Sequence, residues 1–415
     1  MDNRGALFRE AREVSAKYIS ARLLAAGFND LPDTGALVLR VLPHIGHSPA
    51  RLAAELEITE QEASDTVDVL VQRGYLEVTV APEDSAGRPM VLVTERGRAA
   101  ERTALDAFKA ARWADFTFRP GDIVVSTWPK SGTAWMQTIC ALLIFQTPDL
   151  PAAISELSPW LDESLLPREQ VYAELAAQQH RRIIKTHLPL DEITIDSRAT
   201  YIVVARHPLD TGVSLYHQNI NRDRQNINRP APPGEASPHP PGAEEPGPDK
   251  PGPYKRGPRP PDTPREWLLG WIDTDPSPQG DYHYLAEMMR YMSAAWERRH
   301  QPNVVLVHYE ELSADLSGEM RRIAARLGVS VPDDVWPSLV HTATFENMRA
   351  SADRFVSAGI TLKDNAAFFR QGKSGEGSSL LTDAELVRYH ARVAPLAPAD
   401  MLAWLHRDYG VMSNP

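Results

Sequence analysis

The chain has 415 residues, of which 42% are hydrophobic and 24% are charged. This length suggests two or three domains, and this globular composition excludes collagen, coiled coil and wholesale disorder. Lysine and arginine number 44 against 55 aspartates and glutamates, a net charge of −11. So acidic a chain is a poor general binder of nucleic acid or anionic membrane, and any anion it binds must be held by a local site.

The sequence carries no signal for a membrane or an oxidising compartment. Its longest apolar runs, such as residues 140–145, are far too short to span a bilayer. The N-terminal residues are charged where a secretory signal would be apolar. Cys140 is the one cysteine, which excludes an internal disulfide and a multi-cysteine metal site. We therefore expect a cytoplasmic protein.

Residues 1–110 read as helices followed by a hairpin. The pair Thr59 and Glu62 has the spacing of a capping box, and Ser48 with Pro49 marks another helix start. Helix, turn, helix and β-ribbon together predict an α+β winged-helix domain. With its ending TERGRAA, this quarter of the chain resembles the MarR-like winged-helix family. The helical patterns cover 13–27, 48–58 and 59–74, and the strand patterns cover 75–80 and 89–94.

The charge of this domain argues against DNA binding. Residues 1–105 contain 12 lysines and arginines against 16 aspartates and glutamates, whereas phosphate contacts supply most non-specific affinity for DNA. We expect the domain to form a homodimer, cover the acceptor site or dock a carrier protein. The helix 59–74 should present Glu60, Glu62, Asp65 and Asp68 to solvent and turn Ala63, Val67, Leu70 and Val71 to the core.

A second pattern begins near residue 115 and predicts an α/β domain over 115–415. Short, nearly continuous apolar strands alternate with helices, which is typical of a parallel sheet covered on both faces. A proline-rich insertion at 222–265 interrupts it, with 14 of the 35 prolines between Pro230 and Pro264. We interpret it as a surface insertion, with a lid or a ligand for a proline-binding module as alternatives. The strands are expected at 122–127, 181–186, 200–205 and 303–309.

The strongest chemical signal is the segment STWPKSGTAWMQTIC, which directly follows the first of these strands. A strand, a short loop and a helix present backbone N–H groups to an anion. Lys130 adds a charge, and Ser131 and Thr133 add hydroxyls. The segment is not a Walker A loop, because Lys130 and Ser131 precede Gly132, and no later acidic residue is clearly placed to hold Mg²⁺. It predicts a site for a phosphate-type anion rather than a nucleotide triphosphatase.

Two further strand ends carry cations and possible bases. Arg206 follows the strand 200–205, with Ser214 eight residues on. Lys185 and His187 stand at the end of the strand 181–186, on one face of an extended segment. Ligands of open α/β sheets bind at the carboxyl edge of the strands. A guanidinium and a hydroxyl suit a second phosphate, and a Lys–His pair suits charge stabilisation and general-base catalysis.

In this order and spacing, the three segments resemble the cytosolic sulfotransferase family, whose donor is 3′-phosphoadenosine 5′-phosphosulfate (PAPS). TWPKSGTAW is similar to its 5′-phosphosulfate loop, RHPLDTGVSLYH to its 3′-phosphate motif and KTHLP to its catalytic-base segment. VHYEEL, ATFENMR and FFRQGKSGEG resemble later family segments, although Gln371 stands where the family usually has lysine. The resemblance implies the sulfotransferase fold, a P-loop-like parallel sheet flanked by helices.

The resemblance also implies roles for individual residues. Lys130 would neutralise the leaving phosphate, Lys185 would steady the sulfuryl group and His187 would be the general base. Trp135 would stack on adenine, and no metal is required. Trp160 could line the acceptor pocket with His187. The donor PAPS and the product 3′-phosphoadenosine 5′-phosphate (PAP) would be bound by Lys130, Ser131, Gly132, Thr133, Ala134, Trp135, Arg206, Ser214, Tyr309, Phe345, Arg370, Gln371 and Gly372.

The expected function is therefore transfer of a sulfuryl group from PAPS to a hydroxyl of a small-molecule acceptor. The alternative is a winged-helix transcriptional regulator whose second domain senses PAPS or PAP. The set Lys130, Lys185 and His187 favours the enzyme, because a sensor needs phosphate ligands but no base. A kinase on the same scaffold is a weaker third reading. Neither the acceptor nor the oligomeric state follows from the sequence.

Overall fold

The computed structural model describes residues 16–45, 49–80, 89–164, 166–222, 261–274, 284–352, 362–364, 366–370, 372 and 374–407. Two compact units divide these residues: unit 1 holds those up to 108, and unit 2 those from 109 onward. Ser48, Gln371 and most of the proline-rich insertion expected at 222–265 lie outside the described residues.

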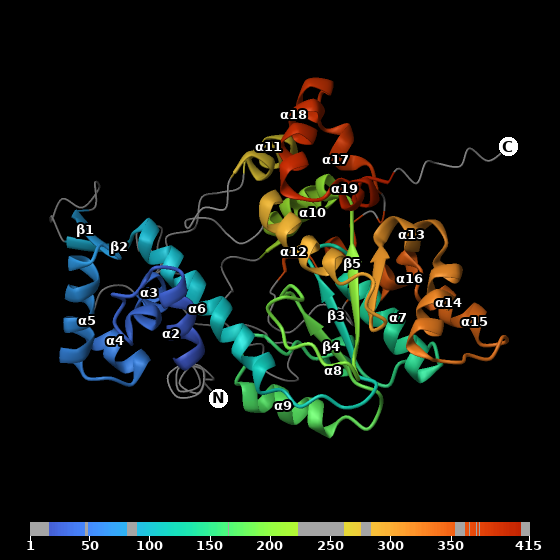
Figure 1. Ribbon diagram of the computed structural model, residues 1–415, viewed down its shortest axis with the longest axis horizontal. Helices are drawn as coiled ribbons and strands as arrows, with labels where there is room; N and C mark the ends of the chain where they lie inside the picture. The colour runs from blue at the N-terminus through green and yellow to red at the C-terminus, as the bar shows by residue number, and fades with distance from the viewer. Residues whose placement is uncertain are drawn as a thin grey trace, which may run out of the picture. The chain divides into compact units, whose positions relative to one another are not determined.

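Unit 1 is a set of helices followed by a β-hairpin (Figure 1). The capping box is confirmed, since the Thr59 hydroxyl accepts the N–H of Glu62 and the Glu62 carboxylate accepts that of Thr59. The hairpin is confirmed as well, with Leu76 opposite Val93. The elements are α2 (Ala16–Ala25), α3 (Gly35–Ile45), α4 (Pro49–Leu56), α5 (Glu60–Gln72), β1 (Leu76–Val80), β2 (Pro89–Val93) and α6 (Glu95–Ala114).

Helix α5 divides its residues between core and solvent as its sequence predicts. Ala63 and Leu70 are fully buried, and Val67 and Val71 pack against the same core. The side chains of Glu60, Glu62, Asp65 and Asp68 are all exposed. The solvent face of this helix is therefore acidic.

The start of α6 is fixed against the end of α5. The Thr94 hydroxyl donates to the carbonyl of Gly74 at 2.7 Å. The hydroxyl of Tyr75 donates to Asp30, and Arg96 pairs with the same carboxylate. At Gly97 a β carbon would lie only 2.2 Å from the Tyr75 carbonyl oxygen, so this close approach requires glycine. These contacts explain why the sequence has threonine, arginine and glycine at positions 94, 96 and 97.

Unit 2 is built on a four-stranded parallel sheet in the order β4-β3-β5-β6 (Figure 1). Its strands are β3 (Ile123–Thr127), β4 (Ile183–Thr186), β5 (Thr200–Ala205) and β6 (Val304–His308). Each lies within a range that the sequence predicts, and the prediction of a parallel sheet is confirmed. Because all four strands run the same way, the residues that follow them meet at one edge.

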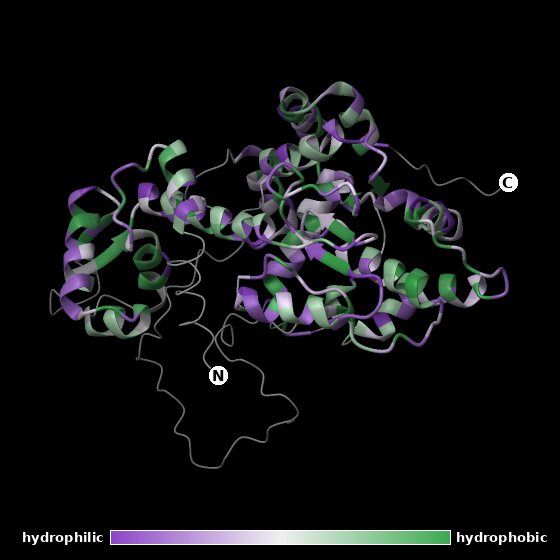
Figure 2. Ribbon diagram, turned by 60° about the horizontal axis from the view of Figure 1, so that its bottom comes forward, coloured by the Kyte–Doolittle hydropathy of each residue, from purple (hydrophilic) through white to green (hydrophobic). Residues whose placement is uncertain are grey.

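Each face of the sheet is covered by its own hydrophobic cluster. Val124 and Val203 point to the cluster that contains α12, whereas Val125 and Val204 point to the cluster that contains α7 and α14. The alternation follows from the two-residue period of a strand. Both sets are buried, so apolar residues face both sides of the sheet, and the apolar parts of the strands are green in Figure 2.

Helices fill the connections between the strands and the region after β6. They are α7 (Thr133–Phe145), α8 (Ile154–Leu157), α9 (Arg168–Ala177), α10 (Pro208–Asn221), α11 (Pro264–Asp273), α12 (Leu285–Glu297), α13 (Tyr309–Ala314), α14 (Leu316–Leu327), α15 (Trp336–Thr342), α16 (Phe345–Ala350), α17 (Glu376–Ser379), α18 (Asp383–Val393) and α19 (Ala399–Leu405), with 3₁₀ turns η3 (Ala366–Phe368) and η4 (Ala394–Leu396). No helix in the described ranges combines the length and apolarity needed to cross a bilayer.

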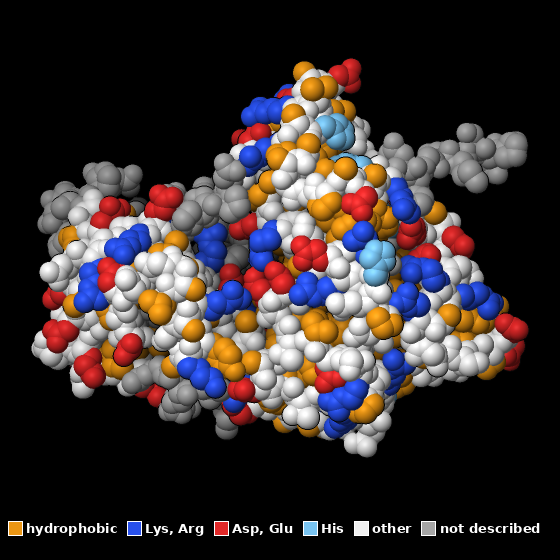
Figure 3. Space-filling view, in the orientation of Figure 1, with side chains coloured by type: hydrophobic (Ala, Val, Ile, Leu, Met, Phe, Trp, Pro, Cys, Tyr) orange, Lys and Arg blue, Asp and Glu red, His pale blue; other side chains and the backbone are white. Residues whose placement is uncertain are grey.

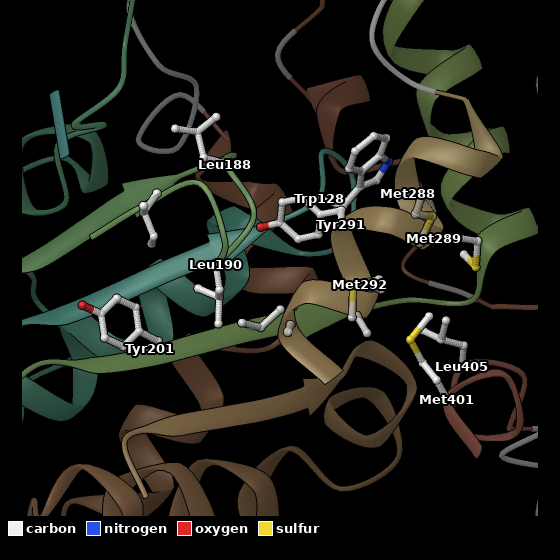
Figure 4. Packing of buried hydrophobic residues seen from close by; sticks show 14 of the residues in the cluster. Trp128, Leu188, Leu190, Tyr201, Met288, Met289, Tyr291, Met292, Met401 and Leu405 are labelled. Atoms are coloured by element: carbon white, nitrogen blue, oxygen red, sulfur yellow. The ribbon is translucent and has the colours of Figure 1, made fainter. Parts of the chain in front are cut away.

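Helix α12 braces the segment that follows β4 (Figure 4). The Tyr291 hydroxyl lies 2.5 Å from Ser126 Oγ, and Ser126 donates to the Leu188 carbonyl at 3.1 Å. Trp128 packs edge-on against the Tyr291 ring. Residues next to the strand ends are thus held by a buried network rather than by loop packing alone.

Candidate active site

A cavity of about 160 Å³ opens in unit 2 where the strands end. It brings together side chains from the segments that follow β3, β4, β5 and β6 and from the region around residue 370. Its walls are formed by Pro129, Lys130, Gly132, Thr133, Ala134, Trp135, Gln137, Lys185, His187, Arg206, Ser214, His217, Gln218, Asn221, Tyr309, Phe345, Met348, Leu362, Ala367, Phe368, Phe369, Arg370 and Gly372.

The loop between β3 and α7 takes a backbone form that few residues tolerate. Lys130 has φ +69° and Gly132 has φ +105°, both in the left-handed region. At Gly132 a β carbon would also lie 3.0 Å from the Tyr309 ring. The loop leads directly into the first turn of α7, where backbone N–H groups have no partner within the helix. This is the geometry of an anion-binding loop.

Lys130 supplies a partly buried amine to this loop. Burial, with Arg206 nearby, lowers the pKa of Lys130 to about 7. Its Nζ atom lies 4.0 Å from the centre of the Phe368 ring. An anion bound in the cavity would restore the ordinary charge of this amine, because an opposite charge nearby favours the protonated form.

Lys185 and His187 lie together at the end of β4. The Nδ1 atom of His187 is 2.8 Å from the Thr127 carbonyl oxygen. Lys185 Nζ lies 4.2 Å from the centre of the Trp160 ring, and that ring meets the His187 ring edge-on. Burial lowers the pKa of Lys185, although Glu163 and Asp162 oppose the shift. A lysine and an oriented histidine therefore share one wall of the cavity.

An aromatic wall lies on the side of α7 and α13. Trp135 and Tyr309 meet edge-on with ring centres 5.1 Å apart. The Trp135 indole N–H donates to the Ala343 carbonyl at 2.8 Å, which holds the ring in place. The guanidinium carbon of Arg206 lies 4.3 Å from the centre of the Tyr309 ring. Apolar ring faces beside a guanidinium suit a flat, anionic ligand.

The segment around Arg370 is attached to α10. Arg370 pairs through both terminal nitrogens with the Glu376 carboxylate. The buried carboxylate of Asp210 accepts the N–H groups of Gly375 at 2.7 Å and Gly377 at 2.8 Å. Two segments more than 150 residues apart in the chain are thereby joined behind the cavity.

A buried contact between His308 and Glu310 supports the same segment from β6. His308 Nδ1 lies 2.6 Å from the Glu310 carboxylate, whose other oxygen accepts the Ser374 hydroxyl at 2.9 Å. Burial raises the pKa of Glu310, but His308, Arg206 and Ser374 together outweigh it and hold this pKa below its usual value. The Arg370 segment is therefore tied to the sheet end as well as to α10.

Most of the residues that the sequence predicts for the site line this one cavity. Ser131 is an exception: it is fully buried, and its hydroxyl has no hydrogen-bond partner among the described residues. Trp160 also does not line the cavity; it lies behind Lys185 and His187. The predicted residues that line the cavity are Lys130, Gly132, Thr133, Ala134, Trp135, Lys185, His187, Arg206, Ser214, Tyr309, Phe345, Arg370 and Gly372.

Sequence reasoning missed part of the lining. His217, Gln218 and Asn221 follow Ser214 on α10 at helical spacing, a periodicity that could have pointed to them. Phe368 and Phe369 directly precede Arg370, so their position in the sequence could have pointed to them. Asp210 acts through contacts with a segment 165 residues away, which no local pattern indicates. Glu376 pairs with Arg370 six residues before it, at a spacing that no helical or strand period predicts.

A parallel sheet with an anion-binding loop and cations at its strand ends is typical of an enzyme that binds an anionic ligand at this edge. Residues 120–394 match the model of the sulfotransferase domain, and residues 29–86 match that of the MarR family. The chain belongs to the sulfotransferase family of enzymes.

Curated relatives agree with this assignment. The chain is 40% identical over 308 residues to the glycolipid sulfotransferase of Mycobacterium bovis, covering 71% of this chain and 90% of that protein. It is 26% identical over 291 residues to sulfotransferase 1A1 of Rattus norvegicus, covering 68% of this chain and 86% of that protein.

Solved structures share the fold. The mouse sulfotransferase SULT7A1, solved in complex with PAP, matches with a TM-score of 0.50 at 20% identity over 72% of this chain and 92% of that one. Retinol dehydratase, solved with androsterone and PAP, matches with a TM-score of 0.51 at 19% identity over 79% of this chain and 93% of that one. Both confirm the prediction of a sulfotransferase fold for unit 2.

Proposed function

We propose that this sulfotransferase moves a sulfuryl group from PAPS to a hydroxyl of a small-molecule acceptor. The observation that carries the proposal is that Lys130, Lys185, His187 and Arg206, from the ends of three parallel strands, line one cavity. A loop for an anion, two further cations and an oriented histidine are the parts that this transfer needs.

The donor fits the cationic and aromatic walls of the cavity. The loop from Lys130 to Thr133 would take the 5′-phosphosulfate, and Trp135, Tyr309 and Phe345 the adenine. The 3′-phosphate would lie with Arg206, Ser214 and Arg370, with Gln371 and Gly372 beside them. Support comes from the PAP complexes of proteins that share this fold.

The chemistry requires a proton acceptor and charge neutralisation. The acceptor oxygen attacks sulfur while the bond from sulfur to the 5′-phosphate oxygen breaks. The hydroxyl proton passes to His187, and Lys130 neutralises the charge that grows on the leaving phosphate. Lys185 would steady the sulfuryl oxygens. No metal is needed for these steps.

The acceptor side of the proposal is supported by the relative that acts on glycolipids. That protein aligns over 90% of its length with this chain. A lipid-linked sugar hydroxyl is therefore the first acceptor to try, ahead of phenols and sterols. Trp160, which packs on Lys185, would influence the acceptor through that contact rather than by lining the cavity.

We propose that unit 1 serves the enzyme rather than DNA. Four exposed acidic residues on α5 would face the phosphates of a duplex. On the face shown in Figure 3, charged side chains of both signs are interspersed among the described residues. A homodimer or a carrier-protein contact remains our proposal for this domain, which we place at residues 1–110 before the transferase domain at 115–415.

The test is calorimetric titration of the full chain with PAP beside adenosine 5′-monophosphate, which lacks the 3′-phosphate. We expect PAP to bind more tightly, and this preference to collapse in Arg206→Ala. The exposed Arg388 serves as a matched control, so Arg388→Ala should bind PAP like the wild type. Equal binding of the two nucleotides by folded wild-type protein would refute the donor assignment. If PAP is preferred and Arg206→Ala loses this preference, sulfuryl transfer from PAPS to a lipid glycoside is measured next.

A further inference from the structure

His217 is a cavity residue that the proposed chemistry does not use. It lies three residues after Ser214 on α10, so the two side chains share a face of that helix. Both line the cavity, as does Arg370. His217 therefore stands beside the place proposed for the 3′-phosphate.

The Nε2 atom of His217 lies near charged groups but forms no hydrogen bond with the described residues. Its Nε2 atom is shielded from solvent and has no hydrogen-bond partner among the described residues. The nearest carboxylate oxygen is that of Glu376, 3.9 Å away and beyond hydrogen-bond distance. A buried polar nitrogen in this state is costly and is satisfied by a ligand that brings an acceptor.

The local charges keep His217 neutral without such a ligand. Burial and the neighbouring Arg370 lower the pKa of His217 to about 4. The charged groups that face it are Arg370 and, from α17, Glu376, which is itself paired with Arg370. Arg206 and Lys130 line the same cavity and add positive charge. An entering dianion would reverse this balance, because an opposite charge within a few ångströms favours the protonated form.

We propose that His217 is a further ligand of the donor's 3′-phosphate and takes up a proton when this dianion binds. The inference rests on the proposed function, since it assumes that PAPS and PAP bind in the cavity. The imidazolium would donate a charge-assisted hydrogen bond to a phosphate oxygen. A nucleotide with a plain 3′-hydroxyl would not protonate it, so His217 would contribute to the choice of donor.

The proton uptake can be measured on the full chain. PAP is titrated calorimetrically at pH 7 in two buffers of different ionisation enthalpy, and the difference in heat gives the number of protons bound. We expect wild type to take up more protons than His217→Asn. The variant should bind PAP roughly tenfold or more weakly, as expected for loss of a hydrogen bond to a charged group. Its affinity for adenosine 5′-monophosphate should stay the same.

Controls separate this inference from the proposed function. His300→Asn removes an exposed histidine of the same unit and should match wild type in both measurements. Equal proton uptake and equal PAP affinity in wild type and His217→Asn would overturn the role of His217 alone. A wild type that does not bind PAP would overturn both proposals. If His217→Asn does not fold, His217→Gln and the imidazole ¹⁵N shifts of wild type with and without PAP give the same answer.

Discussion

The Nδ1 atom of His187 lies 2.8 Å from the carbonyl oxygen of Thr127. A carbonyl only accepts, so Nδ1 carries the proton and the lone pair stands on Nε2. Thr127 ends β3 and His187 directly follows β4, and these strands pair with Ser126 opposite Thr186. The register of the sheet thus sets the tautomer of the proposed base.

Replacing this base should slow the chemical step without loss of donor binding. We expect His187→Ala to lower kcat by about 10² to 10⁴, the usual contribution of general-base catalysis. PAP affinity, measured by calorimetry, should change little, because the imidazole is assigned to the acceptor's proton. A variant with full kcat would refute the assignment.

Burial of the Lys130 amine should lower the stability of the unliganded protein, by an amount that depends on pH. Its pKa falls to about 7 in the fold, from 10.5 in an unperturbed lysine. Between these values the unfolded chain binds more protons, so stability rises with pH from about 7 to 10. Below about pH 7 the full cost of burying the charge is present.

Lys130→Met should therefore raise the melting temperature at pH 7, and this gain should shrink toward pH 10. It should also abolish transfer from PAPS. Lys363→Met, at an exposed lysine of the same unit, is the matched control and should show no such narrowing. If the melting temperatures of wild type and Lys130→Met differ by the same amount at every pH from 7 to 10, the proposed cost of burying the charge is contradicted.

Asp210 should matter for donor binding although it does not line the cavity. An asparagine there keeps one acceptor oxygen and turns an N–H₂ group toward a backbone N–H of Gly375 or Gly377. Leaving one such buried group unpaired costs about 1–3 kcal/mol. We expect Asp210→Asn to weaken PAP binding and to lower kcat less than KM rises. Asp400→Asn, at an exposed aspartate on α19, is the control.

Gly97 should be intolerant of even a methyl group. Its β carbon would lie 2.2 Å from the Tyr75 carbonyl oxygen, so Gly97→Ala should destabilise unit 1 by roughly 1–3 kcal/mol, the usual cost of overpacking. Gly270 in α11 has open space around its β position, so Gly270→Ala should be neutral or slightly stabilising. Hydrogen exchange of the α5 amides checks Gly97→Ala, and that of the α11 amides checks Gly270→Ala. Unchanged protection of α5 in Gly97→Ala would contradict the steric argument.

The sequence by itself determined the parts of this protein that depend on local pattern. Near-continuous apolar strands predicted the parallel sheet, because strands buried on both faces cannot alternate. The capping box at Thr59 and the acidic face of α5 followed from spacing alone. The loop at Lys130 and the cations after the strands were predictable because parallel strands bring their ends to one edge.

Only the tertiary structure decided which side chains meet. Trp160 lies behind Lys185 rather than in the cavity, because this contact depends on how two separate segments pack. Glu376 pairs with Arg370, six residues before it, at a spacing that no helical or strand period predicts. The link from Asp210 to Gly375 spans 165 positions and leaves no periodic trace in the sequence. His217 acquires its depressed pKa from burial and from Arg370, and burial is a property of the folded chain rather than of any motif.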